Sequence, residues 1–169
     1  MPESFAPVRT TPLVGRIAII GMGLIGSSLA RAARELNLAG QIAAADRDPA
    51  VASRVRALGL ADTVSQSAAD AVAMADLVIL CVPVGICGQV AEQIAGSLKP
   101  GAIVSDVGSV KGAIMDQVGP HLPAGVHFVP AHPVAGTEHS GPDAGFSSLF
   151  LNRWCILTPP DDADAGAVQ

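Results

Sequence analysis

The chain has 169 residues, a length that suits one domain with a sizeable core and is too short for two ordinary domains. Its formal net charge of -5 and its aromatic content of 3% argue against a surface that binds nucleic acid or an anionic membrane. The N-terminus lacks the basic start and apolar run of a signal peptide, and no apolar run approaches the ~18 residues of a membrane span. We therefore expect a cytoplasmic protein with no nucleic-acid or membrane partner.

Short apolar runs alternate with helical patterns along the chain. The runs predict strands at 16–20, 41–45, 76–82, 102–107, 127–131 and 154–158, with a minor strand near 63–65. Three- to four-residue spacing predicts helices over 25–36 (with Gly40 as a stop), 49–58, 67–74, 86–98 and 109–118. This alternation predicts an α/β fold of Rossmann type, a doubly wound and mainly parallel sheet with helices on both faces.

The sequence has three cysteines, Cys81, Cys87 and Cys155. Their number is odd, and no two of them form a CxxC motif. Their spacing is typical of neither a disulfide framework nor a thiolate metal site. We predict reduced cysteines in the core and no metal centre.

The unusual polar and glycine-rich segments directly follow the predicted strands. In a doubly wound sheet, ligands bind beyond the carboxyl ends of the strands. The segments that begin there are 21–23, 46–47, 83–84, 108–109 and 132–133. We expect them to share one edge of the sheet and to form a ligand site.

The first of these segments, GMGLIG, is a G-x-G-x-x-G motif between a strand and a helix, the context in which it binds a dinucleotide. Gly21 permits the tight turn, Gly23 lets a pyrophosphate approach the backbone, and Gly26 lets the helix pack close to the strand. The positive helix end then faces the phosphates. We predict cofactor contacts over the whole motif: Gly21, Met22, Gly23, Leu24, Ile25 and Gly26.

Asp46 ends the second predicted strand, near the spacing expected of an acid that binds the ribose hydroxyls. A carboxylate there repels a 2'-phosphate, which favours NAD over NADP. Arg47 leaves NADP open, because a guanidinium can pair with that phosphate. Asp46 could instead belong to a helix cap before Pro49. Other predicted cofactor contacts are Val82, Pro83 and Gly108.

Three stretches, IAIIGMGLIGSSLARAAR, SDVGSVKGAIMDQV and HFVPAHPVAGTEHSG, resemble the prephenate/arogenate (cyclohexadienyl) dehydrogenases of tyrosine biosynthesis. The resemblance implies oxidative decarboxylation of prephenate or arogenate, with hydride passing from the substrate ring to the nicotinamide. It also implies that His132 is the catalytic histidine, which accepts the proton of the ring hydroxyl, and that Ser109 contacts the same hydroxyl. Thr137 and Glu138 match loop residues beside the substrate pocket.

Each of these residues has a plainer interpretation. Ser109 could only cap a helix, His132 could be a structural loop histidine, and Glu138 could be a surface carboxylate. Lys111 is interpreted as a solvated charge or one at the edge of the cofactor, and His139 as a surface residue.

The resemblance also implies a domain organisation. We expect a tail over 1–15, an NAD-binding Rossmann domain over 16–158, and over 159–169 the start of a linker to a helical domain outside this chain. In the family that domain forms the homodimer and supplies an arginine to the substrate, so we expect little turnover from this chain alone. Two alternatives are a module that binds NAD without turnover and a β-hydroxyacid dehydrogenase.

Overall fold

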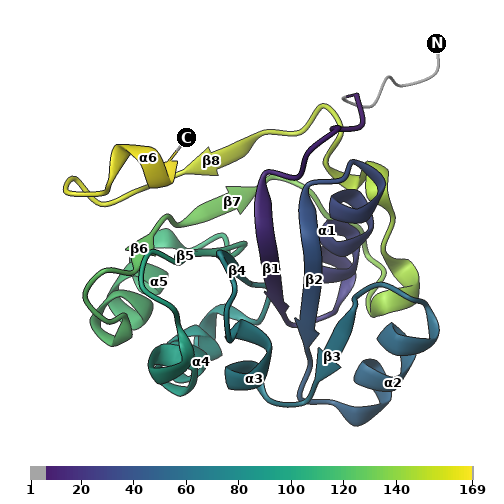
Figure 1. Cartoon of the computed structure of the whole chain (residues 1–169), viewed down its shortest axis with the longest axis horizontal. Coiled ribbons are helices and arrows are strands. Elements are labelled where there is room, and N and C mark those ends of the chain that lie inside the picture. Colours follow the sequence, from purple (N-terminus) through teal and green to yellow (C-terminus); the bar gives the residue numbers. More distant parts are fainter. Residues whose placement is uncertain (1–6, 169) are drawn as a thin grey trace.

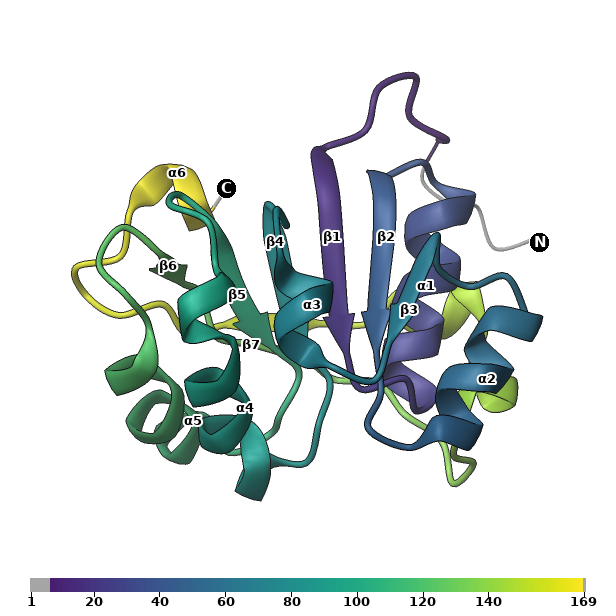
Figure 2. The ribbon, with the colours of Figure 1, turned by 60° about the horizontal axis from the view of Figure 1, so that its bottom comes forward.

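The computed structural model describes residues 7–168, and its centre is a six-stranded parallel sheet. The strand order is β3-β2-β1-β4-β5-β6, which confirms the predicted Rossmann-type fold. The strands are β1 (Val14–Ile20), β2 (Ala39–Ala45), β3 (Thr63–Ser65), β4 (Leu77–Leu80), β5 (Ile103–Asp106) and β6 (His127–Phe128). The order reverses between β1 and β4, and the arrowheads of β1 and β2 point to one edge in Figure 2. A doubly wound sheet binds its ligands at that edge.

Helices cover both faces of the sheet, because alternate residues of each strand point to opposite sides. On β1, Ile17 and Ile19 pack with helices α1 (Leu24–Glu35) and α2 (Pro49–Ala57). Ala18 and Ile20 point to the opposite face and pack with helices α3 (Ala68–Val72), α4 (Cys87–Ile94) and α5 (Lys111–Val118). A short α6 (Ala165–Val168) lies near the end of the chain (Figure 1). Within residues 7–168, no helix is long and apolar enough to cross a membrane.

Within the described residues 7–168, five short 3-10 turns complete the helical elements. They are η1 (Val84–Ile86), η2 (Ala95–Ser97), η3 (Gly119–His121), η4 (Pro142–Ala144) and η5 (Ser147–Phe150). Both η1 and η2 adjoin α4, while η4 and η5 lie in the segment that follows the HPVAGTEHSG stretch.

The predicted strand 127–131 is wrong as a single element. Its first part is β6, which pairs with β5, and Val129 N still donates to Val104 O at 2.9 Å. Pro130 has no amide hydrogen and cannot continue this ladder. The chain then enters β7 (Ala131–Pro133), which pairs antiparallel with β8 (Cys155–Leu157) in a separate two-stranded sheet (Figure 1). The predicted strand 154–158 therefore does not join the parallel sheet, and His132 lies within a strand rather than after one.

Gly40 is not the stop of the first helix, because it lies inside β2. The helix ends at Glu35, and Leu38 N closes the turn by donating to Ala33 O at 2.8 Å. The glycine is needed for close strand packing, since a Cβ there would lie 2.9 Å from Gly15 O.

The three cysteines are all free thiols, but only part of the prediction about them holds. Cys87 is buried in the core, and burial raises the pKa of its thiol to about 11. Cys81 is partly buried, while Cys155 lies on the exposed face of β8, so its placement in the core was wrong.

The amino end of β4 carries an ion pair that makes stability depend on pH. Asp76 pairs with Lys99 and accepts the amide hydrogen of Arg16 at 2.7 Å, and both contacts hold its pKa below the ordinary value. A lowered pKa means that this stabilisation is present above about pH 4 and is lost as the carboxylate protonates in acid. We expect Asp76→Asn to lower the free energy of unfolding at pH 7 by up to about 1 kcal/mol, because the pair is a third exposed.

Chemical denaturation at pH 7 and pH 3 measures this effect. The difference between Asp76→Asn and the unmodified chain should shrink at the lower pH. Asp116→Asn, which changes an exposed carboxylate on α5, is the control. An equal difference at both values would contradict the role of the ion pair.

Candidate active site

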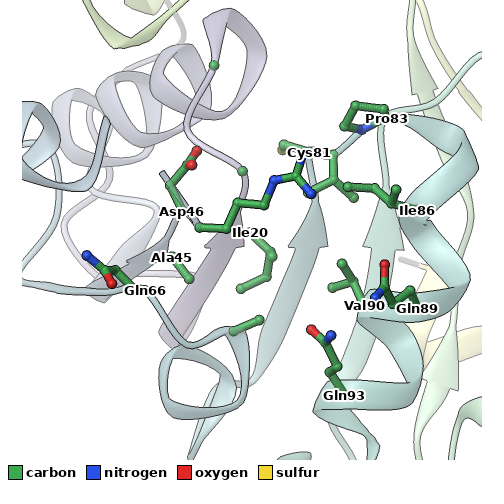
Figure 3. Close-up of a pocket in the computed structure, with 15 residues that line it drawn as sticks. Ile20, Ala45, Asp46, Gln66, Cys81, Pro83, Ile86, Gln89, Val90 and Gln93 are labelled. Carbon is green, nitrogen blue, oxygen red and sulfur yellow. The ribbon is translucent and has the colours of Figure 1, made fainter. Parts of the chain in front are cut away.

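A hollow of about 460 Å³ opens at the carboxyl edge, where the strand order reverses. Several of the predicted cofactor residues line it, namely Gly21, Gly23, Asp46, Arg47, Val82 and Pro83. Its other wall is formed by α4 (Figure 3). The remaining predicted cofactor residues do not line it, and these are Met22, Leu24, Ile25, Gly26 and Gly108.

The three motif glycines occupy three different environments. Gly21 has a φ of 94°, and a Cβ there would lie 2.5 Å from Cys81 O. A Cβ on Gly26 would lie only 2.0 Å from Gly21 O, so the helix touches the turn at this point. Gly23 is different, because a Cβ there meets no atom within 4 Å. Gly23 therefore borders open space, which leaves the backbone approachable by a ligand.

Asp46 connects the end of β2 to the glycine loop. Its Oδ2 accepts the amide hydrogen of Met22 at 2.8 Å, and its Oδ1 accepts that of Asp48 at 3.0 Å. The cap of α2 is Asp48, which accepts from Ala50 N at 2.8 Å, so Asp46 is not the helix cap. A carboxylate has about four lone-pair sites. Asp46 thus retains the capacity to accept two hydroxyl hydrogens from a ligand in the hollow.

Three glutamines in the wall of the hollow were missed by sequence reasoning. Gln66 directly follows β3, so its position at the carboxyl end of a strand could have identified it as a site residue. Gln89 and Gln93 stand four residues apart on α4, a spacing that places both on one face of the helix. Figure 3 shows them across the hollow from Asp46. Their amides add hydrogen-bond donors and acceptors to this wall of the hollow.

Asp106, at the carboxyl end of β5, is the most buried acid of the site, with 1% of its surface exposed. Its Oδ2 accepts the amide hydrogen of Gly108 at 2.7 Å and pairs with the ammonium of Lys111. Its Oδ1 accepts the amide hydrogen of Ala131 at 3.3 Å. One carboxylate therefore joins the turn that carries Ser109 to the start of β7.

The structure corrects the interpretation of Lys111 and excludes the helix-cap alternative for Ser109. Lys111 is not a solvated charge, because its side chain is 15% exposed and also donates to Ala131 O at 2.6 Å. Ser109 does not cap a helix, since α5 begins at Lys111 and its N-cap position is Val110. Ser109 is an exposed residue.

His132 is half-buried in β7, opposite Ile156 of β8. Its ring atom Nδ1 is buried and has no hydrogen-bond partner among residues 7–168. Leaving a buried polar atom without a hydrogen-bond partner costs free energy. The histidine is thus held by its strand, while its ring retains hydrogen-bonding capacity.

The segment after His132 is anchored on α1 and α2. Phe146 N donates to Ser28 Oγ at 3.1 Å, and Arg54 Nε donates to Asp143 Oδ1 at 2.9 Å. A Cβ on Gly145 would lie 2.2 Å from Ser27 Oγ, so the backbone lies directly on the helix. Ser27 belongs to the second turn after the glycine loop. The intervening residues 134–141 therefore run from β7 to the N-terminal part of α1.

Thr137 and Glu138 lie in that intervening part, and both are exposed. The Thr137 hydroxyl accepts the amide hydrogen of His139 at 3.2 Å, and Glu138 pairs with the His139 ring at 3.4 Å on the surface. The exposure of His139 agrees with its interpretation as a surface residue.

A second hollow, of about 480 Å³, lies on the α1 side of the sheet and is mostly apolar. It is bordered by Leu29 of α1, Ile79 of β4 and Pro133 of β7. Trp154, which is 81% exposed, and Arg153 stand at its rim. Asp106 and Ala131 also line this second hollow, so the Asp106 network borders an apolar groove.

Comparison with known proteins agrees with these features. The family model "Prephenate dehydrogenase, nucleotide-binding domain" matches residues 29–169. A cyclohexadienyl dehydrogenase of Zymomonas mobilis is 47% identical over 152 residues, which cover 90% of this chain and 52% of that protein. Synechocystis arogenate dehydrogenase has a TM-score of 0.81 at 30% identity, over 89% of this chain and 52% of that one.

Prephenate dehydrogenase from A. aeolicus, solved in complex with hydroxyphenyl propionate and NAD+, has a TM-score of 0.77 at 28% identity. The match covers 91% of this chain and 54% of that one. This chain therefore spans about half the length of the proteins it matches. The family match and the identity to the Zymomonas protein show that the chain belongs to the prephenate dehydrogenase family, in which it corresponds to the nucleotide-binding domain.

Proposed function

We propose that this chain is the cofactor-binding part of an NAD-dependent dehydrogenase that oxidatively decarboxylates prephenate or arogenate. The observation that carries the proposal is the joining of the Ser109 turn and the His132 strand by Asp106, on the same sheet edge as the glycine loop. The relatives that match over half their length carry the same activities in their names. Three free thiols agree with a reducing compartment, and we place the reaction in the cytoplasm.

His132 and Ser109 have distinct roles in this proposal. The His132 ring accepts the proton of the substrate's ring hydroxyl, because hydride loss becomes easier as that oxygen gains negative character. Ser109 donates or accepts a hydrogen bond at the same hydroxyl and orients it. NAD supplies the hydride acceptor when bound, and the chain supplies position and polarity. Thr137 and Glu138 contact the substrate from the exposed loop.

The proposed cofactor is NAD rather than NADP. Asp46 lines the hollow with two acceptor sites left for ribose hydroxyls, and a 2'-phosphate there would meet its negative charge. The pyrophosphate would lie over Gly23, where the backbone borders open space, at the positive end of α1. Arg47 lines the same hollow and is the residue that could instead favour a 2'-phosphate.

Calorimetric titration of the 169-residue chain with NADH and NADPH tests the cofactor. We expect NADH to bind at least ~10-fold more tightly, a difference of about 1.4 kcal/mol. Asp46→Asn should reduce that preference, because the amide no longer repels the phosphate. Tighter binding of NADPH by the unmodified chain would transfer the specificity role from Asp46 to Arg47.

The reaction is tested in a fusion of this chain to the remaining half of the Zymomonas mobilis relative. NADH formation is followed with prephenate and with arogenate as substrates. We expect turnover with one or both, and homodimerisation through the added half. NADH binding without turnover of either substrate would favour a binding module over an enzyme.

A further inference from the structure

The Asp106–Lys111 pair connects the two segments that carry the proposed catalytic residues. We propose that Asp106 and Lys111 are positioning residues, which hold the β7 strand of His132 against the turn of Ser109. The proposal rests on the function proposed above, because it assigns a purpose to the placement of those two residues. Neither Asp106 nor Lys111 touches the substrate in this account.

The hydrogen bonds of the Asp106–Lys111 pair end on the neighbours of Ser109 and His132. Asp106 accepts from the amide of Gly108, the neighbour of Ser109, and from the amide of Ala131, the neighbour of His132. Lys111 joins the same carboxylate to the carbonyl of Ala131 at 2.6 Å. Both backbone polar groups of Ala131 are therefore held by one ion pair, one residue away from His132.

The ion pair also takes the place of a backbone hydrogen-bond ladder. The backbone ladder between β5 and the following segment ends when Val129 N donates to Val104 O at 2.9 Å. Pro130 offers no amide, so the next donor is Ala131 N, which reaches a side chain instead of a backbone carbonyl. The Asp106 carboxylate thus replaces a backbone carbonyl of β5 as the hydrogen-bond acceptor. It directs the chain out of the parallel sheet into β7. Without it, β7 would be held mainly by its pairing with β8.

The burial of this ion pair has an energetic cost. The Asp106 side chain is fully buried and that of Lys111 is 15% exposed. Removing two charges from water costs free energy that their attraction often fails to recover, so an apolar pair of similar size can be as stable. A buried ion pair whose bonds end on the neighbours of Ser109 and His132 therefore contributes geometry more than stability.

The experiment compares Lys111→Met with a matched control in the 169-residue chain. The control is Lys99→Met, which breaks another lysine–aspartate pair on the same sheet, at the amino end of β4 and away from the site. Nuclear magnetic resonance of histidine-labelled protein follows the His132 ring, and hydrogen exchange follows the Ala131 amide. We expect Lys111→Met to shift the ring signals, because the ammonium no longer holds the Ala131 carbonyl next to His132. The Ala131 exchange rate should rise ~10-fold or more, because the segment opens more often once this hydrogen bond from a charged group is lost. Lys99→Met should change neither.

Lys111→Met leaves a buried carboxylate without its partner and can prevent folding. The double variant Asp106→Asn with Lys111→Met removes both charges and still breaks the bond to the Ala131 carbonyl, so the same changes are expected in it. Unchanged His132 signals and Ala131 exchange in a folded variant would overturn the proposal, as would equal changes in Lys99→Met. In the fusion protein, displacement of His132 should lower kcat ~10–100-fold with little change in KM for NAD. The resonance measurement needs no turnover. A result against the positioning role is therefore distinguishable from a result against the proposed reaction.

Discussion

Replacing His132 with asparagine in the fusion protein is expected to lower the turnover rate by a factor of ~10²–10⁴, the usual contribution of a general base. Asparagine retains a polar side chain of similar reach but cannot accept a proton near neutral pH. NAD affinity should stay the same, because His132 lies in β7 and does not line the hollow at the glycine loop. Steady-state rates at saturating NAD and substrate, together with calorimetric NADH binding, measure the two quantities.

His127→Asn is the matched control, since His127 is also half-buried in a strand but belongs to β6, which pairs with β5. It should keep full turnover. A loss of NADH affinity in His132→Asn, with turnover intact at saturation, would mean that the loop clamps the nucleotide instead of catalysing the reaction.

The alternation of apolar runs and helical patterns was enough to predict the parallel sheet. Its strands are buried on both faces, so runs such as 16–20 and 76–82 are apolar after their first, charged residue and stand out from the amphipathic helices. The glycine motif was equally readable, because its spacing reflects close contacts that exclude any side chain, as at Gly26. The fold and the geometry of the glycine turn thus follow from local patterns.

The separation of β7 from β6 was not readable in the same way. Residues 127–131 were predicted as one strand from their mainly apolar composition. Pro130 alone could have indicated a break in the hydrogen-bond ladder of that strand. The direction of the chain after that break depends on Asp106, a contact across 25 positions. Periodicity contains no information about such a partner. His132 was therefore expected after a strand, whereas it lies inside one.

The residues around the candidate site were predicted unevenly for a related reason. Asp106 and Lys111 belong to the stretch SDVGSVKGAIMDQV, but the sequence does not reveal that their charges face each other inside the protein. Ser27 and Ser28, wholly buried on α1, support the loop after His132 through tertiary contacts alone. Gln89 and Gln93 share a helical face, yet which face meets the hollow is decided by how α4 packs.

Alanine substitutions at two glycines of the motif should separate cofactor binding from folding. Gly23→Ala places a methyl group in the open space where the pyrophosphate is proposed to lie. It should weaken NADH binding ~10–100-fold, through the loss of one or two hydrogen bonds to a charged group. Gly23 has a φ of -73°, which alanine adopts without strain, so the folded chain should be unchanged or about 0.4–1 kcal/mol more stable.

Gly26→Ala is the counterpart within the same motif. Its methyl group would lie 2.0 Å from Gly21 O, and α1 must move away from β1 to accommodate it. Overpacking of this kind costs about 1–3 kcal/mol or more, so this variant should unfold at a lower denaturant concentration. Calorimetry and chemical denaturation on both variants give the two comparisons. If Gly23→Ala bound NADH as tightly as the unmodified chain, the pyrophosphate could not lie over Gly23, and the hollow would have to hold the cofactor in another orientation.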